Sequence, residues 1–423
     1  MPTAKDSLKS YASSAMLLTA ASALLNLSMV VYHREMSGRL LDGYADLAAL
    51  LGLVNITGAL ANGVGTWMTR VFSHDAALHG EGPTVARLIR LLPRLGAGLL
   101  AITAVLAVMG PWMASYLQLS SGPAYAWACV TVASGLGIMG GRALLQGLHR
   151  FHDLALSYLV DAVARPVVPL LLASVGGLAG AMAGTAVVPV LAMAFMAPLL
   201  WRHRHSKPVE MAVEPVAGPL RDTVAMALFS LVCFLDLFLF KHAFGADKPL
   251  VGVYSRAAVM GKSFLYLGSA VMLVALPALG AAAARRRDPW PLLMRFMGAL
   301  AALQALGLAV LWAFTIPMLK LLLTDLPSLP EIAPLARWFA LAAAPLALFQ
   351  LTLLYSLVVH AKGMVTLMAV VSVAYVASLT WLATGPYGYV ACLGGCSMTL
   401  LVGGLVVVHR APAFDGQHVR EAE

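Results

Sequence analysis

The sequence predicts an all-α protein that crosses a membrane about twelve times, as two lobes of six helices each. Of its 423 residues, 61% are hydrophobic and only 11% are charged, whereas a soluble domain averages about 45–50% apolar and about 25% charged residues. Apolar stretches of about 20 residues, the length that crosses roughly 30 Å of hydrocarbon, recur along the chain. Lys and Arg outnumber Asp and Glu by 28 to 19. Because these cations gather in short loops, they indicate membrane topology rather than a nucleic-acid partner.

The apolar stretches lie between short polar segments, and each is predicted to be one membrane span. The first has no small-residue cleavage site, so it is predicted to span rather than to be a signal peptide. The four cysteines all fall inside apolar runs, which favours packing roles over a disulfide framework or a metal site. The twelve predicted spans are near residues 11–31, 44–69, 93–117, 123–145, 156–176, 180–201, 221–241, 252–283, 292–318, 332–357, 363–384 and 386–409.

The basic residues of the short loops predict the orientation. With the N-terminus in the cytoplasm, about 19 of them fall on the cytoplasmic side and 5 on the opposite side. This bias predicts an even number of crossings with both termini in the cytoplasm. The longest hydrophilic break in mid-chain separates six spans from six. The predicted parts are a six-helix lobe (1–201), a cytoplasmic linker (202–220), a second six-helix lobe (221–410) and a cytoplasmic tail (411–423).

Charged residues inside the predicted spans are the candidate functional groups, because a charge at the bilayer centre costs roughly 2.5–3.5 kcal/mol even on lenient scales. In the second half, a rise of about 1.5 Å per residue puts Asp236 and Arg256 at similar depths, so they are predicted to pair. Lys262 lies deeper, near the midplane, with no acidic residue near it in the sequence. The alternatives are a buried pair with a purely structural role and, for Lys262, an ammonium bound by carbonyls or snorkelling.

The first half has its own charged residues. Asp161 and Arg165 are four residues apart on the fifth span, a spacing that lets such a pair stabilise itself along one helix face. The segments 42–52 and 252–262 are weakly alike, with Tyr44 aligned to Tyr254 and Asp46 to Arg256. Such internal repeats are common in transporters, where the binding site lies between the halves. An interfacial position is the alternative for Asp46.

Together these residues predict a central cavity with surplus positive charge, formed by Arg165, Arg256 and Lys262, with Asp46, Asp161, Asp236 and Tyr254 as charge partners or gating residues. Intramembrane charges usually face a water-filled cavity, and Arg suits phosphate because its planar fork grips two oxygens. The expected ligand is therefore anionic and phosphorylated. No phosphate-binding loop, HExxH motif or nucleophile elbow occurs. No enzyme activity, metal or cofactor is predicted, and Glu35 with Asp42 is a poor candidate pair for a membrane enzyme.

The segment "FLDLFLFKHAFGADKPLVGVYSRAAVMGKSFLYLGSAVMLVALPALG" (234–280) resembles the seventh and eighth spans of polysaccharide flippases of the multidrug/oligosaccharidyl-lipid/polysaccharide (MOP) exporter superfamily. The matching positions are Asp236, Gly252, Tyr254, Lys262 and Pro277. The segment "GRALLQGLHRFHDLAL" (141–156) is similar to the cytoplasmic turn between spans four and five of that family, through Arg142, Gln146, Gly147, Arg150 and Phe151. Arg142 and Arg150 thereby become candidates for a cytoplasmic gate.

This resemblance implies a V-shaped, two-lobe MOP/MATE-like bundle that works by alternating access. It implies that an undecaprenyl-diphosphate-linked oligosaccharide moves across a bacterial inner membrane for cell-surface polysaccharide or exopolysaccharide synthesis. Membrane lipids, a polysaccharide polymerase and other assembly proteins would be the partners. The alternatives are a cation-coupled multidrug exporter, disfavoured because the first span lacks an acidic residue, and a peptidoglycan-precursor flippase, which usually carries two further spans. A major-facilitator carrier would share the span number, but its loop pattern after span two is missing here.

Overall fold

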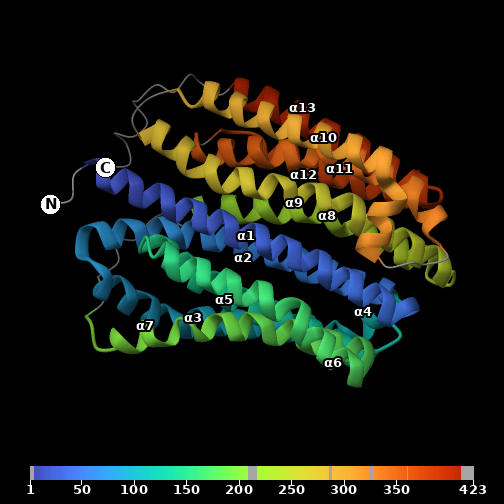
Figure 1. Ribbon diagram of the computed structural model, residues 1–423, viewed down its shortest axis with the longest axis horizontal. Coiled ribbons are helices and arrows are strands. Elements are labelled where there is room, and N and C mark those ends of the chain that lie inside the picture. Colours follow the sequence, from blue (N-terminus) through green and yellow to red (C-terminus); the bar gives the residue numbers. More distant parts are fainter. Residues whose placement is uncertain (1–3, 208–216, 285–287, 324–327, 360, 411–423) are drawn as a thin grey trace. The chain divides into compact units, whose positions relative to one another are not determined.

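A computed structural model describes residues 4–207, 217–284, 288–323, 328–359 and 361–410. The predicted tail 411–423 and part of the predicted linker (208–216) lie outside the described residues. All secondary structure in the described ranges is helical (Figure 1). The chain divides into two compact units, Met1–Ala227 and Leu228–Glu423.

The helices of unit 1 lie alongside one another (Figure 1). A single 3₁₀ turn, η1 (Leu41–Gly43), links the first two long helices. The helices are α1 (Ala4–Leu40), α2 (Tyr44–His79), α3 (Glu81–Val108), α4 (Gly110–Tyr116), α5 (Gly122–Gly147), α6 (Phe151–Ala194) and α7 (Ala197–Arg202).

The helices of unit 2 are all long, and α11 packs against three of the others, α9, α10 and α13. They are α8 (Ala217–Phe244, which begins in the last residues of unit 1), α9 (Lys248–Ala284), α10 (Trp290–Leu323), α11 (Leu329–Val358), α12 (Met364–Trp381) and α13 (Gly385–His409).

The predicted all-helical, multi-span class is confirmed. Among the described residues, nine helices are long and apolar enough to cross a membrane, and helical structure occupies all twelve predicted positions. The predicted third span, 93–117, is wrong in detail because it is two helices, α3 and α4, separated at Met109. Pro111 explains the break, since its ring clashes with the preceding turn and it has no N–H to donate.

The helix α6 contains the predicted fifth span and most of the predicted sixth, which ends in α7, and the two spans meet at Gly177. This residue has φ 54° and ψ −133°, a backbone conformation that side chains other than that of glycine rarely permit. A Cβ on Gly180 would lie 1.9 Å from the carbonyl oxygen of Leu172, and a Cβ on Gly184 would lie 2.3 Å from Cα of Pro169. Residues that far apart in sequence cannot touch along one continuous helix. The chain therefore turns back at Gly177, and the two arms pack with their backbones almost in contact.

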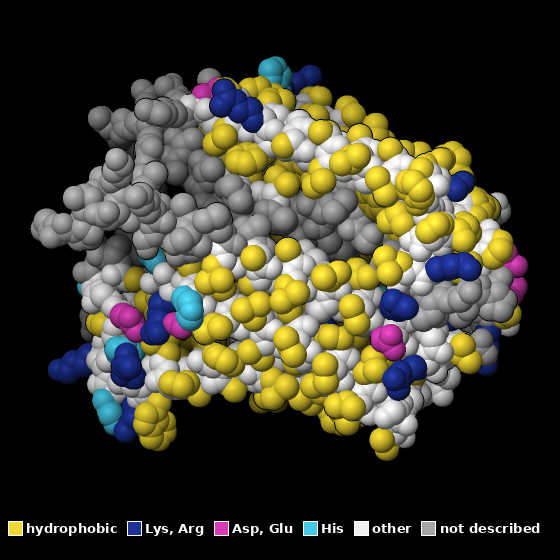
Figure 2. All heavy atoms as spheres, in the orientation of Figure 1, with side chains coloured by type: hydrophobic (Ala, Val, Ile, Leu, Met, Phe, Trp, Pro, Cys, Tyr) yellow, Lys and Arg dark blue, Asp and Glu magenta, His cyan; other side chains and the backbone are white. Residues whose placement is uncertain are grey.

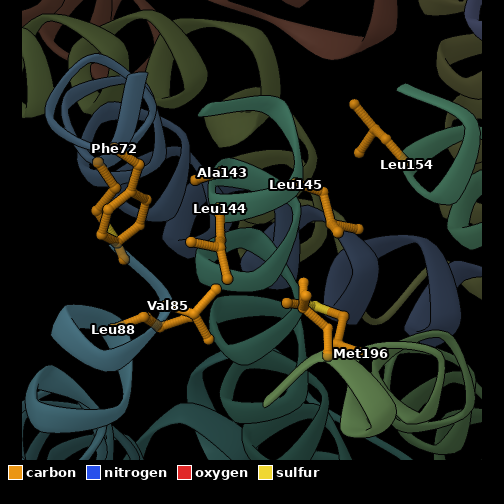
Figure 3. Packing of buried hydrophobic residues seen from close by; sticks show 10 residues of the cluster. Phe72, Val85, Leu88, Ala143, Leu144, Leu145, Leu154 and Met196 are labelled. Carbon is orange, nitrogen blue, oxygen red and sulfur yellow. The ribbon is translucent and has the colours of Figure 1, made fainter. Parts of the chain in front are cut away.

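The core of unit 1 joins α2, α3, α5, α6 and the start of α7 (Figure 3). Gly141 leaves room for the thioether of Met196, whose Sδ would lie 2.1 Å from a Cβ at this position. In unit 2, Gly261 allows α9 to approach α11 closely, because a Cβ on this residue would lie 2.2 Å from Cβ of Phe339 and 2.8 Å from the backbone N of Ala340. Small residues at helix contacts are typical of membrane bundles. The buried cluster of unit 1 comprises Met68, Phe72, Val85, Leu88, Ala143, Leu144, Leu145, Leu154, Met196 and Leu199.

The outer surface fits a lipid environment. On the face shown in Figure 2, hydrophobic side chains cover the lower helices along their middle, and charged side chains gather toward the helix ends. Large apolar residues such as Leu100, Val163 and Val175 are well exposed. Exposed apolar area of this extent is rare on soluble monomers. The chain is therefore a multi-pass membrane protein.

Candidate functional site

The candidate site in unit 2 is centred on Asp236, which lies on α8 and is fully buried. Its Oδ1 accepts a hydrogen bond from Nζ of Lys262 at 2.5 Å, and its Oδ2 accepts one from the hydroxyl of Tyr254 at 2.9 Å. Both donors come from α9. The carboxylate therefore joins α8 to α9 through a buried ion pair and one neutral hydrogen bond.

Lys262, which binds Asp236, has no acidic residue near it in the sequence. Depth counted along the helix places Lys262 about six residues below the carboxylate, yet its ammonium reaches Oδ1 of Asp236. Arg256, the expected partner, is also buried, with 7% of its surface exposed. Its Nη1 lies back along α9, 3.0 Å from the place where a Cβ on Gly252 would stand. The absent side chain at Gly252 thus leaves room for the guanidinium.

Aromatic rings hold Tyr254 in place. Its ring stacks on Phe240 with centroids 3.7 Å apart and planes 6° apart, and it meets the edge of Phe339 at 5.1 Å. Tyr389 of α13 contacts the Phe240 ring edge-on at 5.1 Å. Such contacts between buried rings restrict rotation as well as burying area. The hydroxyl of Tyr254 is therefore fixed at Asp236 by packing from three other helices.

Two further polar side chains of unit 2 come from α12. Ser372 and Tyr375 are 3% and 2% exposed, and neither hydroxyl has a hydrogen-bond partner among the described residues. Tyr375 lies close enough to Asp236 to interact electrostatically with its carboxylate. Sequence reasoning missed both residues, because a Ser or Tyr within an apolar span has no pattern that separates it from core.

The buried charges of unit 2 are mainly positive. Lys241, Arg256 and Lys262 are at most 7% exposed, and Asp236 is the one buried carboxylate among the described residues of this unit. A site rich in basic side chains attracts anions and repels cations. Unit 2 therefore has the electrostatic character of a site for an anion.

Unit 1 holds a second charged cluster around Asp161 of α6. Its Oδ1 accepts from both Nε and Nη2 of Arg165, at 2.9 and 2.7 Å, so the predicted i, i+4 pair is confirmed. Its Oδ2 accepts from Nη2 of Arg142 at 3.0 Å. Arg142 also donates to the hydroxyl and the carbonyl of Ser157, and its guanidinium lies 4.1 Å from the ring centre of Tyr158. Arg142, a candidate for a cytoplasmic gate on sequence, is thus 7% exposed and bound to α6 within unit 1.

The remaining predicted residues of unit 1 have local partners. Asp46 accepts from the backbone N–H and the hydroxyl of Ser120, at 2.8 and 2.5 Å, just before α5 begins. Arg150 donates to Glu81 at 3.0 Å and to Asp153 at 2.6 Å, and all three are partly exposed. Asp46 is buried within the protein, with 4% of its surface exposed. Contacts of this kind fasten helix ends to their neighbours.

No family model matches the chain, and no curated protein sequence matches it. Solved structures do match over nearly the full length. An inward-facing multidrug resistance MATE family transporter of the MOP superfamily has a TM-score of 0.65 at 15% identity, covering 95% of this chain and 99% of that one. The chain has the fold of the MATE transporters. A MATE protein in the straight conformation gives a TM-score of 0.64 at 16% identity, covering 95% of this chain and 97% of that one.

A third matched structure is relevant because of the polarity of its binding pocket. It is a MOP superfamily transporter from Pyrococcus furiosus, with a TM-score of 0.59 at 16% identity over 93% of this chain and 97% of that one. It is described as having a binding pocket of reverse polarity that suggests a different function. At these sequence identities the similarity establishes only the fold. The substrate has to be inferred from the chemistry of the site.

Proposed function

We propose that this protein is a transporter that moves a phosphorylated, lipid-linked oligosaccharide, of the undecaprenyl-diphosphate type, across a bacterial inner membrane by alternating access. The observation that carries the proposal is the surplus of buried positive charge in unit 2. A diphosphate would be attracted to a site that contains Arg256 and Lys262, whereas a cationic substrate would be repelled. The bidentate fork of Arg256 suits phosphate oxygens in particular.

A multidrug exporter is the second candidate, because the matched structures include multidrug resistance transporters. Export of cationic drugs would call for carboxylates open to the substrate. The buried carboxylates Asp161 and Asp236 are instead bound by basic side chains of their own units. This charge pattern supports the flippase over the exporter.

The deciding experiment is reconstitution of the purified protein in proteoliposomes with a fluorescent undecaprenyl-diphosphate oligosaccharide. A membrane-impermeant lectin or periodate then measures the fraction that has changed leaflet. We expect wild type to equilibrate the lipid and Arg256→Gln to slow this at least about tenfold, the effect of losing roughly 1.4 kcal/mol of binding. Arg295→Gln, at an exposed arginine of α10, is the matched control and should behave as wild type.

A parallel assay on the same vesicles follows uptake of a cationic dye under a proton or sodium gradient. Dye transport without movement of the glycolipid would reject the flippase and support the exporter. If the glycolipid moved at equal rates in wild type and Arg256→Gln, the flippase function would be supported, but Arg256 would not be part of its substrate site.

A further inference from the structure

A second feature of unit 2 lies on the outer side of α11, away from the buried charges. Arg337 projects from the third turn of α11 onto α10, where its Nε donates to the Thr315 hydroxyl at 2.6 Å and its Nη2 donates to the Trp312 carbonyl at 3.1 Å. That carbonyl is open because α10 breaks at Phe314, which has φ −123° and ψ 33°. Pro317, which cannot donate an N–H, adds to the break. The kink in α10 thus anchors one edge of the guanidinium.

The other edge of this guanidinium makes no hydrogen bond to any described residue. Within the described part of the chain, no carboxylate lies within salt-bridge distance of Arg337, and its Nη1 makes no hydrogen bond. A guanidinium carries five N–H donors in a fixed fork. Two of these donors are fixed, and the guanidinium carbon lies 5.9 Å from the ring centre of Trp312, which leaves one edge of the group without a hydrogen bond.

The position of Arg337 along α11 places it near the membrane boundary. The 30 residues of α11 extend about 45 Å, some 15 Å more than the hydrocarbon thickness, so a centred helix overhangs by about 7 Å at each end. Arg337 lies about 12 Å from the start of α11, within side-chain reach of the headgroups. The two tryptophans beside it agree with this level. Trp312 and Trp338 meet edge to face at 6.4 Å and are 40% and 50% exposed, as is usual for interfacial Trp.

An apolar groove of about 490 Å³ begins at Trp338 and runs between α11 and α13. Leu341 and Pro345 line it on one side, and Tyr387, Gly394 and Met398 line it on the other. No charged side chain lines it, and its volume falls within the range of small-ligand sites. Tyr387 and Met398 are about half exposed, so the groove opens at the surface.

We propose that this groove and Arg337 form a binding site for one anionic phospholipid of the surrounding bilayer. The phosphodiester binds the free edge of Arg337, and one acyl chain lies in the groove below Trp338. A single guanidinium matches the single charge of a phosphodiester, whereas a diphosphate would call for more than one cation. The site is independent of the proposed transport function, because it requires only that the helices span a membrane.

The test uses the full-length protein in detergent, with native mass spectrometry counting bound phosphatidylglycerol during titration. Arg337→Gln removes the phosphate contact. Gly395→Phe fills the groove, since a Cβ at this lining residue meets no atom within 4 Å and the ring extends into open space. The matched controls are Arg295→Gln and Gly298→Phe on α10, where both residues are exposed and a Cβ on Gly298 is equally open.

We expect wild type to retain one phosphatidylglycerol, with each site variant weakening that binding about tenfold and neither control changing it. The unfolding temperature without lipid checks that each variant folds, and either site variant suffices if the other does not. Equal binding by wild type and both folded variants would overturn the proposal. A neutral diacylglycerol that binds as well as phosphatidylglycerol would overturn the role of Arg337. A polyprenyl phosphate that displaces phosphatidylglycerol from wild type but not from Gly395→Phe would show that the occupant is a prenyl lipid instead.

Discussion

The ion pair between Asp236 and Lys262 can be tested by a double-mutant cycle. Asp236→Asn removes the charge but keeps an oxygen that can accept from the hydroxyl of Tyr254. Lys262→Met removes the ammonium and keeps most of the volume and the apolar stem. The two changes together replace a buried ion pair by two neutral side chains of similar size. The cycle therefore isolates charge from packing.

The burial of the pair sets the expected magnitudes. Asp236 and Lys262 are 0% and 4% exposed, so each single variant leaves its partner as a buried charge without its counter-ion. Breaking such a pair costs about 3–5 kcal/mol, whereas replacing both partners by neutral groups is often close to neutral. We expect each single variant to lower the free energy of unfolding by about 3–5 kcal/mol. The double variant should remain within about 1 kcal/mol of wild type, since neither member of this pair is left as a buried charge without its counter-ion.

The measurement is unfolding of the purified protein in mixed micelles, followed by circular dichroism as the fraction of denaturing detergent rises. Where unfolding is irreversible, the half-life at fixed temperature replaces the free energy. Asp236→Asn combined with Arg295→Gln is the control cycle, and its two effects should add because the residues share no contact. Additive losses for Asp236→Asn and Lys262→Met would refute the pairing, because the double variant would then be the least stable of the set.

Two further predictions concern unit 1. Gly184→Leu should cost about 3 kcal/mol or more, because even a Cβ would lie 2.3 Å from the backbone of Pro169 and the arms of α6 would have to separate. Gly176→Ala, where a Cβ meets open space, is its control, and an equal yield and melting temperature for both would contradict the hairpin. Asp161→Asn should cost about 3–5 kcal/mol, because two guanidinium groups lose their carboxylate. Arg165→Gln should cost about 1 kcal/mol, since its side chain is 25% exposed and solvent screens the charge. If Asp161→Asn and Arg165→Gln lowered the free energy of unfolding equally, Arg165 would be more buried than the structure shows.

Much of the fold could be predicted from the sequence because membrane spans are defined by length and composition. Runs of about 20 apolar residues located all twelve helical positions. Helix ends were less accessible, since α1 continues past the predicted end near residue 31 to Leu40. The residues by which a helix extends beyond the membrane are polar or mixed, so hydropathy does not show where such a helix ends. The turn at Gly177 was implied by the short gap between two predicted spans. The third span was misread because its interruption at Met109 lies within an apolar run.

The site was predictable only where its contacts are local. Asp161 and Arg165 are one helical turn apart, so their pairing follows from spacing alone. The pairing of Asp236 with Lys262 depends on how α8 and α9 are rotated and on the direction in which the lysine side chain extends. The spacing of the two residues in the sequence determines neither. Tyr375 contributes a buried hydroxyl from a third helix. Its recognition requires the tertiary contacts themselves.

The ion pair also constrains how an anionic substrate would bind in unit 2. In unit 1, the carboxylates of Asp75 and Asp161 are bound by arginines of the same unit. In unit 2, Asp236 binds Lys262, and the buried cations outnumber this carboxylate. A diphosphate that reached Lys262 would have to compete with Asp236, which is held beside the ammonium by the packing of α8 against α9. Such competition weakens binding but favours release, because the carboxylate returns to the ammonium as the substrate leaves. The double variant Asp236→Asn with Lys262→Met separates these roles, since it should recover stability while movement of the glycolipid stays slow. Recovery of both would assign the pair to folding alone and leave Arg256 as the cation for the substrate.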